Sequence, residues 1–182
     1  MIYSYKGKHP KIADTAFIAD YVTITGDVQI GEYSSIWFNT VIRGDVSPTI
    51  IGDRVNVQDN CTLHQSPQYP LILEDDVTIG HQVLLHSSLI RKGALIGMGS
   101  IILDGAEIGE GAFIGAGSLV SQGKKIPANS LAFGRPAKVV RQLNEADLED
   151  MARVRNGYVE KGQYYKKSAS ASVASTNVGD LP

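Results

Sequence analysis

The sequence is poor in aromatic residues and has almost no excess of charge. Aromatic residues make up 7% of its 182 residues, and 17 Lys and Arg against 19 Asp and Glu give a net charge of −2. The chain therefore has no electrostatic basis for binding a nucleic-acid backbone or an anionic membrane surface. Because aromatic residues are scarce beside 19 glycines, we expect something other than a core of large rings to use those glycines.

Cysteine and long apolar runs are also scarce. The single cysteine, Cys61, cannot form an intramolecular disulfide, and no run approaches the roughly 18 apolar residues of a membrane span. The N-terminal residues Met-Ile-Tyr-Ser-Tyr-Lys lack the apolar segment of a secretory signal. We therefore expect a soluble cytoplasmic protein.

Aliphatic residues recur at every sixth position over most of the chain. The unbroken series run from Ile12 to Ile42, from Ile51 to Leu63, from Leu73 to Leu85 and from Ile90 to Ile126. An amphipathic helix needs a spacing of 3.6 and a hairpin sheet needs strict alternation, so a period of six fits neither. It predicts an all-β solenoid, a parallel β-helix whose three short strands close each coil, with coils about 4.8 Å apart. The residue after the aliphatic one is often glycine, which we expect to serve the corner backbone.

The repeat and its end define the domain organisation. We expect the β-helix to cover residues 1–140, with outward loops around residues 48–50 and within residues 65–70. Asn144 as an N-cap, acidic residues in the first turns and apolar residues at helical spacing predict a C-terminal α-helix. It should cover roughly residues 145–166 of a segment 141–167 that packs on the solenoid or on a trimer. The Ser- and Ala-rich residues 168–182 are expected to be disordered.

Three histidines take defined places on the predicted coils. His64 and His86 each follow an inward aliphatic residue by one position, on strands one coil apart, so they should stack on one face about 4.8 Å apart. His81 falls on the preceding face, around a corner. Two stacked imidazoles can bind one Zn²⁺, and a third can reach it if three prisms pack about a three-fold axis. The positions predict a homotrimer with a shared zinc site, although iron or cobalt would also suit three imidazoles, and stacked histidines can form a polar ladder without metal.

Polar residues accompany both halves of this predicted site. Arg43 and Asp45 lie on the face of the stacked histidines, whereas Gln58 and Asp59, flanked by Asn56, lie on the face of His81. We expect Gln58 to hydrogen-bond the solvent at the metal, and Asp59 to pair with Arg43 across the subunit interface. Arg43 and Asp45 have the alternative role of holding the subunits together by a salt bridge.

These residues also carry a family resemblance. Set in hexapeptide repeats, the segments Arg43–Asp45, Asn56–Asp59, His64, Gly80-His81 and His86, followed by Gly-Arg-Pro-Ala-Lys at 134–138, resemble the γ-class carbonic anhydrase-like proteins over roughly residues 8–166. The resemblance implies a left-handed β-helix trimer with a metal at each interface. It implies His64, His81 and His86 as metal ligands and Gln58 as the residue that orients the solvent at the metal. Arg43, Asp45 and Asp59 would take interfacial or outer-shell roles, with Asn56 a weaker candidate.

The reaction implied by the resemblance is the reversible hydration of CO₂ to bicarbonate. Zinc lowers the pKa of its bound water from 15.7 to about 7, and the resulting hydroxide attacks CO₂. Unlike the acidic proton-shuttle loop of the family archetype, residues 65–70 contain no carboxylate and no histidine, so hydration should be slow. Two alternatives remain: an acyltransferase on the same repeat fold, which saturable coenzyme A binding would support, and a metal-bearing trimeric binding or scaffold protein without turnover.

Overall fold

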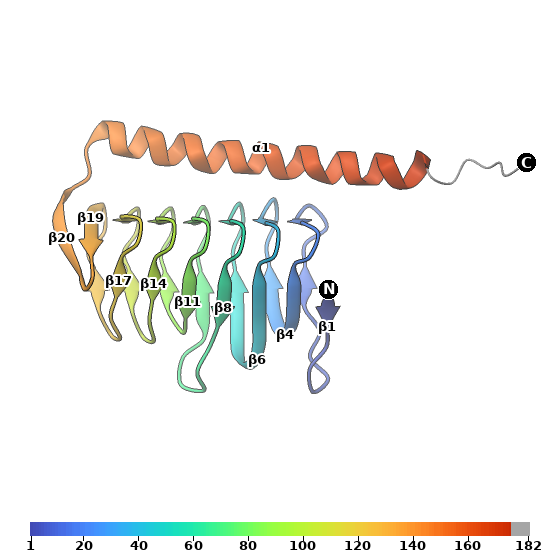
Figure 1. Cartoon of the computed structure of the whole chain (residues 1–182), viewed down its shortest axis with the longest axis horizontal. Helices are drawn as coiled ribbons and strands as arrows, with labels where there is room; N and C mark the ends of the chain where they lie inside the picture. Colours follow the sequence, from blue (N-terminus) through green and yellow to red (C-terminus); the bar gives the residue numbers. More distant parts are fainter. Residues whose placement is uncertain (176–182) are drawn as a thin grey trace, which may run out of the picture.

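The structure is a computed structural model that describes residues 1–175, and it is a left-handed parallel β-helix with one long C-terminal helix (Figure 1). The strands stack into three flat faces, called A, B and C here, and each coil visits them in the order C, A, B. Successive strands on a face pair in parallel. The fold class predicted from the period of six is therefore confirmed.

The strands of the three faces have the following bounds. Face A contains β1 (Ile2–Tyr3), β8 (Thr62–His64), β11 (Leu84–His86), β14 (Ile101–Ile102) and β17 (Leu119–Val120). Face B contains β2 (Lys11–Ile12), β9 (Leu71–Leu73), β12 (Leu89–Ile90), β15 (Glu107–Ile108) and β18 (Lys125–Ile126). Two longer strands, β4 (Thr23–Ile30) and β6 (Val41–Ile51), bend around the corner and belong to both A and B.

Face C is built from β3 (Phe17–Ile18), β5 (Ser35–Ile36), β7 (Asn56–Val57), β10 (Thr78–Ile79), β13 (Leu95–Ile96), β16 (Phe113–Ile114) and β19 (Ser130–Gly134). The last strand, β20 (Ala137–Gln142), pairs antiparallel with β19 and ends the sheet. The last strand therefore ends at Gln142, just after the expected boundary at residue 140.

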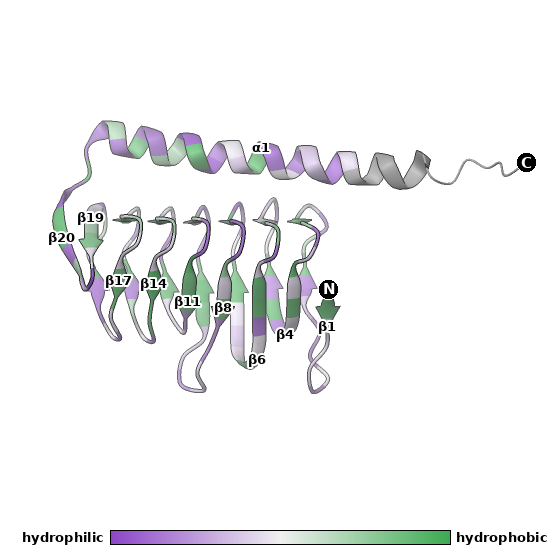
Figure 2. Cartoon of the chain, viewed as in Figure 1, coloured by the Kyte–Doolittle hydropathy of each residue, from purple (hydrophilic) through white to green (hydrophobic). Residues whose placement is uncertain are grey.

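The periodic aliphatic residues form the core. Ile42, Leu63, Leu85 and Ile102 lie directly above one another inside face A and are 0% exposed. Hydrophobic colouring is concentrated in the strands, whereas α1 mixes hydrophobic and hydrophilic residues (Figure 2). The interior is one narrow column of aliphatic side chains, which explains the scarcity of aromatic residues.

The glycine that follows an inward aliphatic residue does not form the corner backbone, contrary to expectation. A Cβ on Gly109 would lie 2.5 Å from the backbone nitrogen of Ala128 in the next coil, and Gly97 is equally confined. The left-handed backbone instead occurs two residues later, at positions such as Gly123 (φ +67°) and Asn129 (φ 52°). The first glycine is therefore required by the close approach of coils, and the second position by backbone conformation.

The C-terminal helix, α1 (Glu145–Ser175), begins at the predicted N-cap and runs back along the stacked coils (Figure 1). The Asn144 side-chain oxygen accepts a hydrogen bond from the Asp147 backbone nitrogen (3.0 Å), and the Asp147 carboxylate accepts one from the Asn144 nitrogen (2.8 Å). The helix continues past residue 166, so residues 168–175 are helical where disorder was expected. The rest of that expected tail, residues 176–182, lies outside the described part.

Aromatic side chains fix α1 against face C. The rings of Tyr158 and Tyr165 each lie 5.4 Å from the ring of Trp37, and Phe17 packs beside them. A Cβ on Gly162 would stand 3.1 Å from the Cβ of Ser35, so this glycine allows the helix to approach closely. Within the described residues, no helix has the apolar length needed to cross a membrane.

We expect Gly109→Ala to lower the free energy of unfolding by about 1–3 kcal/mol or more, because its methyl group must push adjacent coils apart. The control is Gly123→Asn, because a Cβ at Gly123 would have no atom within 4 Å and asparagine tolerates the left-handed backbone. Denaturant unfolding of both variants checks this. Equal losses of stability would contradict the close-approach explanation.

Candidate metal centre

The parallel ladder places two histidines side by side on face A. His64 ends β8 and His86 ends β11, and the two residues are register partners. Each follows a leucine that is 0% exposed, Leu63 or Leu85, and therefore points outward because strand side chains alternate. The two imidazoles are 20% and 29% exposed. The predicted stacking of His64 and His86 is confirmed.

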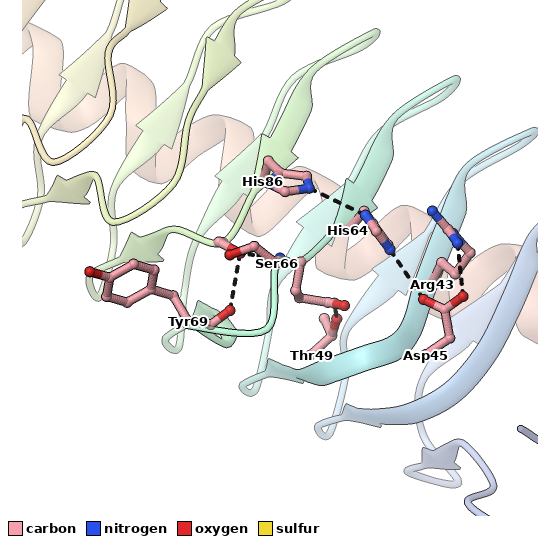
Figure 3. A network of polar contacts seen from close by, with 9 residues as sticks. Arg43, Asp45, Thr49, His64, Ser66, Tyr69 and His86 are labelled. Atoms are coloured by element: carbon pink, nitrogen blue, oxygen red, sulfur yellow. Dashed lines mark hydrogen bonds and ion pairs between the residues drawn. The ribbon is translucent and has the colours of Figure 1, made fainter. Parts of the chain in front are cut away.

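The two rings lie in a row of hydrogen-bonding groups that runs from Asp45 to Asp104; Figure 3 shows the part from Asp45 to His86. His64 Nε2 lies 3.1 Å from Asp45 Oδ1, and His64 Nδ1 lies 3.2 Å from His86 Nε2. His86 Nδ1 in turn lies 2.9 Å from Asp104 Oδ2. Each ring therefore has one nitrogen on a carboxylate and the other facing its neighbour.

This row determines where the protons lie. An ionised carboxylate only accepts hydrogen bonds, so His64 must carry a proton on Nε2 and His86 one on Nδ1. If both rings are neutral, two lone pairs then face each other across 3.2 Å. A cation between the nitrogens, either a proton or a metal ion, removes that repulsion.

The donor set fits zinc. Two nitrogens that each lie 2.0–2.1 Å from a tetrahedral zinc ion are about 3.4 Å apart, close to the 3.2 Å between His64 Nδ1 and His86 Nε2. Carboxylates on the outer ring nitrogens are the usual partners of metal-binding histidines. His64 and His86 could therefore hold a metal through the two nitrogens that face each other.

Both carboxylates in the row favour the ionised form. Partial burial opposes ionisation of Asp45, but hydrogen bonds from His64 and Arg43 outweigh it and lower the pKa of Asp45. Burial likewise opposes ionisation of Asp104, and hydrogen bonds from Ser66 and His86 outweigh it and lower the pKa of Asp104. Both groups therefore remain acceptors near neutral pH.

His81 lies elsewhere in the chain, as its position in the repeat predicted. It follows β10 on face C, and its Nδ1 lies 2.7 Å from Asp59 Oδ2. Among the described residues of a single chain, no three His, Cys, Asp or Glu side chains come together as a metal site. One chain thus brings together His64 and His86 but not His81.

The remaining predicted residues divide between the same two places. Arg43 Nη1 donates to Asp45 Oδ2 at 2.8 Å, whereas Asp59 pairs with His81; a pair between Arg43 and Asp59 across subunits stays a prediction. The Gln58 amide nitrogen donates to Asn56 Oδ1 at 3.1 Å.

A cavity of about 320 Å³ adjoins His81, with Gln58, Met98, Phe113 and Tyr158 in its wall. Burial, together with the nearby charge of Asp59, raises the pKa of Tyr158. Gln58 and His81 of face C therefore line one cavity together with Tyr158 of α1, a helix that was expected only to pack on the solenoid.

Asp104 is the residue that sequence reasoning missed. It stands two positions after Ile102, in the turn that follows β14, which is the strand of face A directly beyond the one that carries His86. The same repeat coordinates that placed the histidines would have placed Asp104 next to His86, because its strand lies one coil further along the same face.

Comparison with known proteins identifies relatives of the whole chain. The family of bacterial transferase hexapeptide repeats matches residues 9–44 and 87–122. A Geobacillus kaustophilus protein named carbonic anhydrase is 70% identical over 182 residues, covering 100% of both chains. Gamma carbonic anhydrase 2, mitochondrial, of Arabidopsis thaliana is 33% identical, and the match covers 91% of this chain and 62% of that protein.

A solved structure carries a different activity name. The crystal structure of a Bacillus cereus protein, described as a candidate acetyltransferase, superposes with a TM-score of 0.91 at 82% sequence identity. The match covers 91% of this chain and 96% of that chain. The Bacillus cereus structure therefore shares the fold of this chain, and the names of the relatives divide between two reactions.

Replacing Asp104 with alanine removes the acceptor that orients His86. We expect metal affinity to fall by about 10–100-fold, the usual cost of losing such a partner. Competition with a chromophoric chelator measures the change. Glu107→Ala is the matched control, because that carboxylate binds Arg91 on face B; affinity unchanged in Asp104→Ala, or lowered equally in both, would contradict the assignment.

Proposed function

Since the chain belongs to the γ-class carbonic anhydrase-like family of hexapeptide-repeat proteins, we propose that it catalyses the reversible hydration of CO₂ to bicarbonate at a zinc site shared between subunits of a homotrimer. The observation that carries the proposal is the pair of facing nitrogens on His64 and His86, 3.2 Å apart. Their other nitrogens are already committed to carboxylates, so the pair is arranged to receive a cation.

The outward side chains of the solenoid support a trimer. On face A the outward column is Val41, Thr62, Leu84, Ile101 and Leu119, and on face C it includes Leu95, Phe113 and Leu131. Face B is apolar only in its middle, and its outer part carries an ion-pair network in which Arg91 bridges Glu74 and Glu107. Face A, and the part of face C from β13 to β19 beyond the strands β3, β5 and β7 on which α1 packs, are therefore the better surfaces to bury against another copy.

Packing face A of one subunit on face C of the next would complete the ligand set. His81 and His86 belong to the same coil, on faces C and A respectively. With three parallel prisms about one axis, His81 of a neighbouring subunit stands level with His64 and His86. His81 Nδ1 lies 2.7 Å from Asp59 Oδ2 and therefore carries the ring proton when the ring is neutral, which leaves Nε2 free to bind.

When bound, zinc supplies the Lewis acid that makes water nucleophilic near neutral pH. The protein residues orient the groups around it. Asp45 and Asp104 fix the ring orientation and tautomer of His64 and His86, Arg43 steadies Asp45, and Asn56 holds the buried Gln58 amide in the cavity beside His81. Three imidazoles would also suit iron or cobalt.

Acyl transfer is the second candidate, because the Bacillus cereus relative carries that name. A histidine that acts as general base needs an unshared nitrogen within reach of the acceptor hydroxyl. In His64 and His86 both ring nitrogens are occupied by each other or by carboxylates. Of the three predicted ligands, only His81, whose Nδ1 faces Asp59, keeps a nitrogen unshared within one chain. The stacked pair therefore favours metal binding, and acyl transfer would have to depend on His81 alone.

Proton export should limit the rate, since residues 65–70 contain no carboxylate or histidine. We expect hydration by the zinc-loaded protein to speed up with increasing concentration of an imidazole buffer, measured by stopped flow. Adding an acidic group by Gln68→Glu should weaken this dependence, whereas Gln142→Glu, at the exposed end of β20, should not. Absence of any hydration above buffer in the metal-loaded trimer would overturn the function and favour a binding protein without turnover.

Complementation tests the shared site. His81→Ala alone and His64→Ala alone should each lose metal from every interface. In trimers mixed at random from equal amounts of the two variants, a site is intact only where face A comes from the His81→Ala subunit and face C from the His64→Ala subunit. About one interface in four meets this condition, so we expect about a quarter of wild-type metal content and hydration to return. Full metal retention by either single variant, or no recovery in confirmed mixed trimers, would contradict a site built from two subunits.

A further inference from the structure

The residue next to His64 in the sequence is almost completely buried and makes hydrogen bonds with the strand that carries Asp45. Gln65 is 1% exposed, and Thr49, its partner in β6, is 0% exposed. A buried amide side chain must satisfy two donor hydrogens and one acceptor oxygen. Gln65 must therefore find acceptors for its amide hydrogens and a donor for its oxygen inside the protein.

Those contacts close a bulge in β6. The pairing of β4 with β6 shifts register, so that Gly26 pairs with Gly44 but Val28 pairs with Thr49. Asp45 and the three residues after it, up to Pro48, thus have only Asp27 opposite them. The usual strand ladder does not hold this segment, although it carries the carboxylate that orients His64.

Gln65 spans both ends of the bulge. The amide orientation is assigned from its neighbours, because two carbonyl oxygens face one end of it. In that orientation the nitrogen donates to the carbonyl oxygens of Arg43 at 2.8 Å and Ser47 at 3.1 Å, and the side-chain oxygen accepts from the Thr49 hydroxyl. Figure 3 shows Thr49 and Asp45 on the same strand, next to the row of histidines. One side chain therefore ties the segment on either side of Asp45 to the strand that ends in His64.

We propose that Gln65 is a positioning residue for the metal centre: by clamping the bulge in β6 it holds Asp45 against His64 Nε2, and so selects the tautomer in which the Nδ1 that faces His86 carries no proton. This inference rests on the proposed metal site. A glutamate would present an oxygen to two carbonyl oxygens, and a methionine would fill the same space without any of the hydrogen bonds.

The loop that follows, residues 65–70, is held in the same way. The Ser66 backbone nitrogen donates to Ser87 Oγ at 2.6 Å, and Ser87 Oγ donates to the Tyr69 carbonyl at 3.0 Å. Ser87 directly follows His86. Each stacked histidine is thus followed by a buried polar residue, Gln65 or Ser87, that fixes the backbone beside it. Through Ser66 and Tyr69 the loop connects the end of β8 to the end of β11.

The test compares Gln65→Met with wild type in the metal-free protein by ¹⁵N NMR of histidine side chains. We expect the His64 Nε2 proton to exchange faster with solvent, while the His86 Nδ1 proton, held by Asp104, stays unchanged. Cobalt affinity should fall about tenfold, with an altered cobalt absorption spectrum. Ser118→Ala, which loses buried corner hydrogen bonds far from β6, controls for a general loss of stability.

Asp45→Asn should reproduce both changes, and Asp45→Asn combined with Gln65→Met should add no further loss of affinity if both act through one contact. An unchanged His64 proton in Gln65→Met, or additive losses, would overturn the proposal. If Gln65→Met does not fold, Thr49→Val removes one of the three bonds and should give a smaller change of the same kind. The NMR measurement needs neither metal nor CO₂, so missing hydratase activity would refute the proposed function without deciding this one.

Discussion

The parallel hydrogen-bond ladder between coils is the constraint on which the rest of the structure depends. It stacks equivalent positions of successive repeats, so residues one coil apart in the sequence become neighbours in space. The register pair of His64 and His86 follows directly from it, and the flanking carboxylates Asp45 and Asp104 lie just beyond the paired residues of the coils before and after. A row of side chains that no local segment could assemble is thus produced by repetition.

The ladder also explains which parts of the molecule were predictable. The period of six located the core, the three faces and the separation of His81 from the stacked histidines, because every inward residue obeys one rule. The end of α1 and the role of the first glycine in each repeat were not predictable. The packing of Gly162 on Ser35 and the 2.5 Å approach at Gly109 depend on neighbours far away in the sequence.

The residues of the site were likewise predictable only where they follow the repeat. His64, His86 and Asp45 were placed by counting along the repeat, and Asp104 was within reach of the same count. The clamp by Gln65 was not, since it depends on how the inserted residues of β6 bulge at a corner where the period breaks. The repeat aligns His64 with His86, and the bulge where the repeat is interrupted positions the side chains of Asp45 and Gln65 beside them.

In the proposed trimer, two subunits share one metal. A crystal structure of the zinc-loaded protein, with anomalous diffraction measured at the zinc edge, tests it most directly. We expect one peak at each interface of a trimer, about 2.0–2.1 Å from His64 Nδ1 and His86 Nε2 of one subunit and from His81 of its neighbour. A peak ligated by residues of a single chain, or none between His64 and His86, would contradict the claim.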